Sequence, residues 1–93
     1  MRKHPLPPLR NSLRAKLLRL VDVYCRHKKL SRASVSDRFI NNSAVLDRVA
    51  SNLSDINTST FERVVQAISD DWPDEVSWPE GIGRPAPHRA RAA

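Results

Sequence analysis

The chain has 93 residues, a formal net charge of +6 and 40% hydrophobic residues. This length suits one small domain and leaves little room for a large enzyme cleft. Residues 1–38 hold eleven Lys or Arg against two Asp, a charge of +9, whereas residues 39–83 hold two Arg against eight acids, a charge of −6. A half with so much positive charge attracts phosphate backbones, with an anionic membrane surface as the alternative partner.

Several classes of protein and site lack support in the sequence. No stretch approaches the roughly 18 apolar residues of a spanning helix, and no signal-peptide pattern begins the chain, so we expect a cytoplasmic protein without membrane contact. Cys25 is the only cysteine, which leaves no internal disulfide and no cysteine-based zinc site. A glycine-rich phosphate loop and a catalytic triad are both missing, so we expect no enzyme, cofactor or small-molecule substrate. We expect no metal site, because Cys25 and the scattered histidines do not supply a set of four ligands.

Residues 1–10, MRKHPLPPLR, contain three prolines among basic residues. Proline removes a backbone donor and interrupts a helix, so we expect a flexible basic arm. Arg2 and Lys3 are candidates to enter a DNA minor groove, as basic arms of other DNA-binding proteins do. The alternative is a solvated end without function.

An amphipathic helix is predicted to begin at Asn11 or Ser12 and to end near Lys28 or Lys29. Its apolar positions follow one another at helical spacing, and they are Leu13, Leu17, Leu20, Val21 and Tyr24. The basic residues on its other faces fit a solvated surface, phosphate contact, or binding of a membrane or a calmodulin-type partner. Cys25 is expected to be a small buried side chain.

The stretch LSRASVSDRFINN, residues 30–42, predicts a second helix of about ten residues. Ser31 is placed to cap it, and Val35 and Phe39 point to one side at a spacing of four. Asn41 and Asn42 end it, since asparagine tolerates the left-handed backbone. The other side of this helix carries small polar residues and little that is bulky.

A third, short helix is expected next, with Ser43 as its cap. Its inward residues are Val45, Leu46, Val49 and Ala50. The polar connection 51–60 is expected to turn Leu53 and Ile56 inward. A final helix is predicted to begin at an SxxE capping box formed by Ser59 and Glu62 and to stop before the first proline of WPDEVSWPEG. Its apolar residues are Phe61, Val64, Val65, Ile68 and Trp72.

In WPDEVSWPEG a Trp-Pro pair recurs after six residues, an interval too short to predict a structural repeat. We expect residues 73–83 to fold back over the small core; the alternative is that they reach over a second subunit. Residues 84–93 are predicted to be a disordered basic tail, because they are small, basic and broken by proline. The whole pattern predicts a compact all-α domain of four to five helices over residues 11–72, with extended basic termini.

Residues 21–40 contain a pattern of residue types at fixed spacing. A small residue, Cys25, is followed by the turn residue Lys29, the apolar Leu30 and the cap Ser31. The sequence SVS follows at residues 34–36. This pattern resembles the helix-turn-helix of phage-repressor-type regulators. Lys29 takes the place of the usual glycine, which requires a left-handed residue or a slightly longer loop. Arg38 stands where such motifs often carry an apolar residue, so Phe39 is left to anchor the helix.

The resemblance implies that the slender second helix enters the major groove of double-stranded DNA. Residues exposed near its start would read base edges, and they are Ser31, Arg32, Ala33, Ser36 and Asp37. Arg32 is the expected reader of guanine through two parallel hydrogen bonds. Phosphates would be bound by Arg26, Lys28, Lys29 and Arg38, which position the helix without reading sequence. Three residues would belong to the core instead: Leu30, Val35 and Phe39.

The implied function is sequence-specific DNA binding by a transcriptional repressor or regulator of a phage or mobile element, nucleoid-associated when bound. A homodimer on an inverted repeat is expected, because a single short helix makes few contacts. The expected dimer interface consists of Phe61, Val65, Ile68, Trp72 and Trp78. Three alternatives stay open: a DNA-bending recombination accessory protein, a protein-interaction adaptor that grips its partner through the Trp-Pro segment, and an RNA-binding protein.

Overall fold

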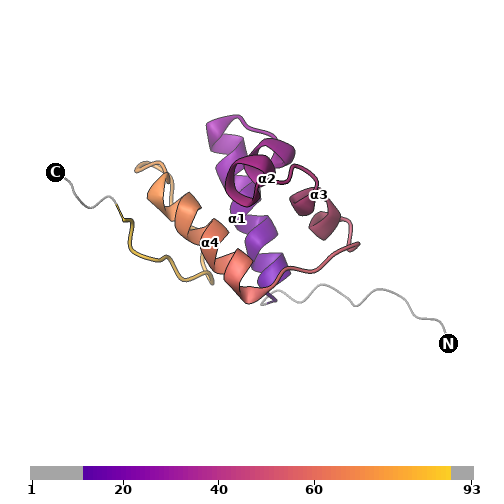
Figure 1. The fold of residues 1–93 in the computed structure, drawn as a ribbon. Helices are drawn as coiled ribbons and strands as arrows, with labels where there is room; N and C mark the ends of the chain where they lie inside the picture. The colour runs from indigo at the N-terminus through magenta and orange to yellow at the C-terminus, as the bar shows by residue number, and fades with distance from the viewer. Residues whose placement is uncertain (1–11, 89–93) are drawn as a thin grey trace.

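The computed structural model describes residues 12–88, and within them four helices surround one core (Figure 1). Helix α1 (Leu13–Lys28) lies beside α4 (Thr58–Asp70), while α2 (Arg32–Ile40) and the short α3 (Val45–Ala50) pack across α1. This part of the chain contains no strand, so the all-α prediction is confirmed. The arm residues Arg2 and Lys3 lie outside the described residues.

Helix α1 forms where its capping residue and its apolar stripe predict it. The Ser12 hydroxyl accepts a hydrogen bond from the Ala15 amide at 3.1 Å, which satisfies one of the free donors of the first turn. Four of the five stripe residues are fully buried, namely Leu17, Leu20, Val21 and Tyr24. The cationic last turn lies next to the negative end of the helix dipole, where positive charge stabilises a helix.

Helix α2 also begins and ends as predicted. The Ser31 hydroxyl accepts from the Ser34 amide at 3.0 Å, and Asn41 has a left-handed backbone with φ of 64°. The prediction of Ser43 as the cap of α3 is wrong, because α3 starts at Val45 and has no side-chain cap from its own flank. A buried hydroxyl of α2, that of Ser36, replaces that cap.

Helix α4 begins earlier than its predicted capping box. Asn57, in an extended conformation, accepts a hydrogen bond from the Thr60 amide at 2.8 Å, so Asn57 is the cap and the Ser59–Glu62 box does not form. In the loop before it, Ile56 is buried as predicted. Leu53 is 73% exposed, so its predicted inward position is wrong.

A row of aromatic rings joins α2, α1 and the end of α4. The rings of Phe39 and Tyr24 are 6.0 Å apart, those of Tyr24 and Trp72 6.4 Å, and those of Trp72 and Trp78 4.9 Å. Aromatic pairs at such distances add to the stability that buried area provides. The row therefore ties the chain beyond α4 to the helical core.

Residues 73–88, which we name the strap, run back along α4 (Figure 1). The first part consists of two similar turns. The Trp72 indole N–H donates to the Val76 carbonyl, and the Trp78 indole N–H donates to the Ile82 carbonyl, both at 2.7 Å. Each Trp-Pro pair therefore begins a turn of its own. The prediction that this segment covers the core is confirmed, since Ile82 is buried.

The second part of the strap is held to α4 by hydrogen bonds. The Arg84 guanidinium donates to the hydroxyl and the carbonyl of Ser69, both at 2.9 Å, and the Ser69 hydroxyl donates to the Pro85 carbonyl at 2.6 Å. Arg84 also lies over the Trp78 ring, 5.2 Å from its centre. The predicted disorder of residues 84–88 is therefore wrong, because the buried Ser69 supplies partners that a linear sequence does not reveal. Residues 89–93 lie outside the described residues.

Candidate nucleic-acid interface

The connection between α1 and α2 is a tight turn. Lys29 has a left-handed backbone, with φ of 58° and ψ of 46°, which is the first of the two alternatives that the sequence left open. The amide N–H groups of Lys29 and Leu30 both donate to the Cys25 carbonyl, which closes the end of α1. Leu30 is half-buried against the core, and Ser31 begins the next helix. Two successive helices are thereby held at a short, defined junction.

The outer face of α2 carries small and charged side chains. Because successive helical residues turn by about 100°, placing Val35 and Phe39 inward leaves four other residues of α2 and its cap exposed. These residues are Ser31, Ser34, Asp37 and Arg38. Arg32 and Ala33 are half-buried at the start of the helix. Ser34 was missing from the predicted base readers, although the same periodicity places it outward.

Ser36 was predicted to read bases, and this prediction is wrong. Its side chain is fully buried, and its hydroxyl donates to the Asn42 carbonyl and accepts from the Leu46 amide at 3.1 Å. Ser36 thus supplies the acceptor that the first turn of α3 lacks on its own flank. The prediction assumed that Ser36 is exposed because it is polar. In the structure Ser36 lies next to Val35 on the inner face of α2.

Replacing Ser36 by alanine is expected to lower the free energy of unfolding by about 1 to 3 kcal/mol, because the buried Leu46 amide loses its acceptor. Thermal or urea unfolding of the two proteins measures the difference. Ser34→Ala is the matched control: it removes a hydroxyl from the exposed face of the same helix and is expected to change stability by less than about 0.5 kcal/mol. Equal stabilities for Ser36→Ala and Ser34→Ala would contradict the capping role.

The four predicted phosphate ligands lie on α1, on α2 and in the turn between these helices. Arg26 and Lys29 are exposed and form no ion pair with the acids of residues 12–88. The Lys28 ammonium is 3.2 Å from the Asp71 carboxylate. Arg38 is exposed and close enough to Asp71 to favour its ionised form. Within residues 12–88, two of the four cations thus have no acidic partner, and the other two lie near one acid, Asp71.

Asp71 also accepts a hydrogen bond from the buried Tyr24 hydroxyl at 2.6 Å. Partial burial acts to raise the pKa of the Asp71 carboxyl, but the bonds from Tyr24 and Lys28 outweigh it and hold the pKa below its ordinary value. Burial and the Asp71 carboxylate raise the pKa of Tyr24. This contact links α1 to the residue that ends α4, beside the candidate interface.

Tyr24→Phe is expected to lower the free energy of unfolding by about 1 to 2 kcal/mol at neutral pH, because a hydrogen bond to a charged acceptor is lost. The folded pKa of Asp71 is depressed, so its contribution is present above the unfolded pKa and disappears as the pH falls through the folded value. Unfolding measured from neutral to strongly acidic pH should therefore show the difference between the two proteins narrowing in acid. A difference that stays constant over this range would contradict the role of the Asp71 charge.

Arg32, the predicted guanine reader, forms an ion pair with α3. Its Nη1 atom is 3.2 Å from Oδ1 of Asp47, and both side chains are partly exposed. The guanidinium is therefore held between the start of α2 and the first turn of α3. Asp47 was not among the predicted site residues, because the residues of the motif give no information about α3.

The predicted dimer interface is contradicted by burial within the chain. Val65, Ile68 and Trp72 belong to the core of their own chain, and Ile68 is fully buried. Trp78 packs between Trp72 and Arg84. The apolar face of α4 is not available for a subunit contact, because α1 and the strap already cover it.

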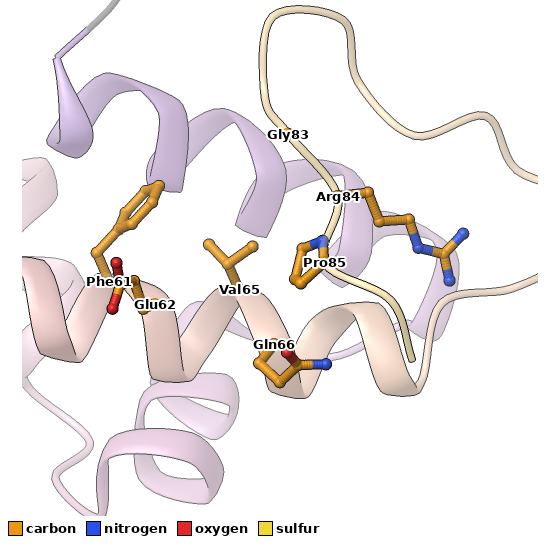
Figure 2. Close-up of a pocket in the computed structure, with 7 residues that line it drawn as sticks. All are labelled: Phe61, Glu62, Val65, Gln66, Gly83, Arg84 and Pro85. Atoms are coloured by element: carbon orange, nitrogen blue, oxygen red, sulfur yellow. The ribbon is translucent and has the colours of Figure 1, made fainter. Parts of the chain in front are cut away.

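A pocket of about 480 Å³ lies between α4 and the strap (Figure 2). Phe61 and Val65 form its floor on the helix, and Gly83 and Pro85 form its wall on the strap. Phe61 is half-buried here rather than free on the surface. The pocket belongs to α4 and the strap, whereas the base-reading candidates belong to α2.

Other kinds of site find little support in the part of the chain that the structure describes. No group of three or more His, Cys, Asp or Glu side chains there could hold a metal ion, and no helix there has the length and apolar character needed to cross a bilayer. Burial raises the pKa of the Cys25 thiol, which disfavours the reactive thiolate. No protein-family model matches the chain, and no similar curated protein or solved structure was found for it.

Proposed function

We propose that this protein binds double-stranded DNA in a sequence-specific manner, with α1 and α2 as a helix-turn-helix and α2 in the major groove. The observation that carries the proposal is the slender outer face of α2, supported from beneath by Val35 and Phe39. Small side chains on that face permit the close approach to base edges that a groove demands. Exposed cations lie on α1, in the turn before α2 and on α2 itself, namely Arg26, Lys29 and Arg38.

The proposed roles follow from charge and exposure. Arg26, Lys28, Lys29 and Arg38 bind phosphates and set the position of α2. Arg32 forms two hydrogen bonds with guanine, Ala33 contacts a thymine methyl group, and Asp37 accepts from a cytosine amino group. Ser31 and Ser34 have hydroxyls that donate or accept, and both are exposed. Ser36 has no part in this interface, because its hydroxyl is used within the protein.

As a biological role we propose transcriptional regulation, chiefly repression, in a phage or other mobile element. A homodimer on an inverted repeat would double the contacts of one short α2. Such a dimer requires a surface other than the buried face of α4.

Selection of bound duplexes from a random pool, followed by affinity measurement on the selected sequence, tests the proposal. We expect one preferred sequence, an inverted repeat if the protein is dimeric. With four phosphate ligands per subunit, log affinity should fall against log salt with a slope of about −3 to −4 per subunit. Failure to shift any duplex at low salt would overturn the proposal and favour a protein-interaction adaptor. A strong bend in the selected duplex would favour a recombination accessory role.

A further inference from the structure

The ion pair between Arg32 and Asp47 joins two elements that are separate in sequence. Arg32 is the first residue of α2, and Asp47 lies in the first turn of α3. The side chains are 37% and 55% exposed, so the pair is open to solvent. Exposed pairs of this kind contribute little to folding stability. A stabilising role therefore does not account for the pair.

The geometry of the pair leaves part of Arg32 free. A guanidinium has five N–H donors in a planar fork. The contact to Asp47 uses Nη1, while no other described residue accepts a hydrogen bond from the Arg32 side chain in residues 12–88. The edge formed by Nε and Nη2 is thus available for a second partner, and guanine offers two acceptors, O6 and N7, at matching spacing.

We propose that Asp47 is a positioning residue that sets the DNA specificity of Arg32; this inference rests on the proposed function. Asp47 holds one edge of the guanidinium and turns the other edge toward the bases. The ion pair also competes with phosphate oxygens for Arg32. If Arg32 leaves Asp47 for a phosphate, it exchanges one anionic partner for another and gains little binding energy. Guanine, in contrast, can be bound by Arg32 while the ion pair with Asp47 stays intact. The pair therefore penalises nonspecific duplexes more than the preferred one.

Asp47→Asn tests this inference, because asparagine keeps the size of the side chain and removes its charge. We expect the affinity for random duplex to rise by about 3-fold to 10-fold and its salt slope to steepen by about one, since Arg32 is released to bind a phosphate. The ratio of selected to random affinity should fall at least about 3-fold. The melting temperature should change by no more than about 4 °C, as for other exposed positions.

Asp74→Asn is the matched control, because it makes the same change in charge at an exposed position of the strap. It is expected to leave the ratio of selected to random affinity unchanged. The double variant Arg32→Ala, Asp47→Asn separates positioning from simple charge. In the Arg32→Ala background, Asp47→Asn should no longer alter the ratio or the salt slope.

The outcomes distinguish the two proposals. If the wild-type protein discriminates between duplexes but Asp47→Asn behaves like Asp74→Asn, the inference about Asp47 is overturned and DNA binding stands. If the effect of Asp47→Asn persists without Arg32, Asp47 acts through its charge alone, and the positioning role is overturned. If the wild-type protein binds no duplex at low salt, the proposed function fails, and this inference fails with it.

Discussion

Trp72→Ala is expected to lower the free energy of unfolding by about 3 to 5 kcal/mol, the largest effect of any single change that we predict. Trp72 is 7% exposed and lies between the rings of Tyr24 and Trp78, and its indole N–H donates to the Val76 carbonyl. Truncation leaves a cavity, removes both ring contacts and frees the Val76 carbonyl. Because small domains have a total stability of about 5 to 15 kcal/mol, much of the variant is expected to be unfolded on modest heating.

Thermal unfolding measures this effect, with a fall in melting temperature of at least roughly 12 °C expected for a domain of this size. Leu53→Ala is the matched control, because Leu53 is 73% exposed and its truncation should cost less than about 0.5 kcal/mol. Trp72→Ala also tests the correction to the dimer interface. An unchanged melting temperature combined with loss of a dimer would mean that Trp72 contacts a second subunit rather than its own core.

Arg32→Ala is expected to weaken binding to the selected duplex by about 1 to 3 kcal/mol and to relax the preference at one base pair. The reason is that Arg32 is proposed to make the hydrogen bonds that distinguish guanine from other bases. Affinity for a random duplex should change much less. Competition between single-base variants of the selected site measures the lost preference directly.

Arg26→Ala is the matched control, since it removes the same type of side chain from a proposed phosphate contact. Arg26 is exposed on α1, and its loss should weaken all duplexes alike and reduce the salt slope by about one. Lys28→Ala should likewise weaken all duplexes, by less if the ion pair with Asp71 already neutralises it. Indistinguishable effects of Arg32→Ala and Arg26→Ala on selected and random duplexes would contradict the division into base readers and phosphate ligands.

The strap changes where a partner can bind. It covers the apolar face of α4 with Trp78 and Ile82 and is held there by the hydrogen bonds between Arg84 and Ser69. The Trp-Pro segment therefore has its indole donors satisfied within the chain. A protein partner that grips these tryptophans, as in the adaptor alternative, would first have to displace the strap from α4.

The sequence by itself determined where α1 and α2 begin and end, because the signals for these two helices are local. Capping serines at 12 and 31, the stripe from Leu17 to Tyr24, and Asn41 each act within a few residues along the chain. For Lys29 the turn pattern left two alternatives open, a left-handed residue or a longer loop, and the structure has the left-handed residue. The helical periodicity also predicted most residues of the outer face of α2. The prediction wrongly included the buried Ser36 and left out the exposed Ser34.

Only the tertiary structure decided which polar side chains are available and which acids oppose which cations. Helix α3 packs against α2, and this contact buries Ser36, whose hydroxyl accepts from the first turn of α3. The same contact brings Asp47 next to Arg32. Ser69 and Arg84 bind each other across fifteen residues and order a segment whose composition predicts disorder. These contacts join residues far apart in sequence, and side-chain periodicity within one element carries no information about them. Packing between the helices therefore decides which of the predicted residues of α2 are exposed and can belong to the candidate interface.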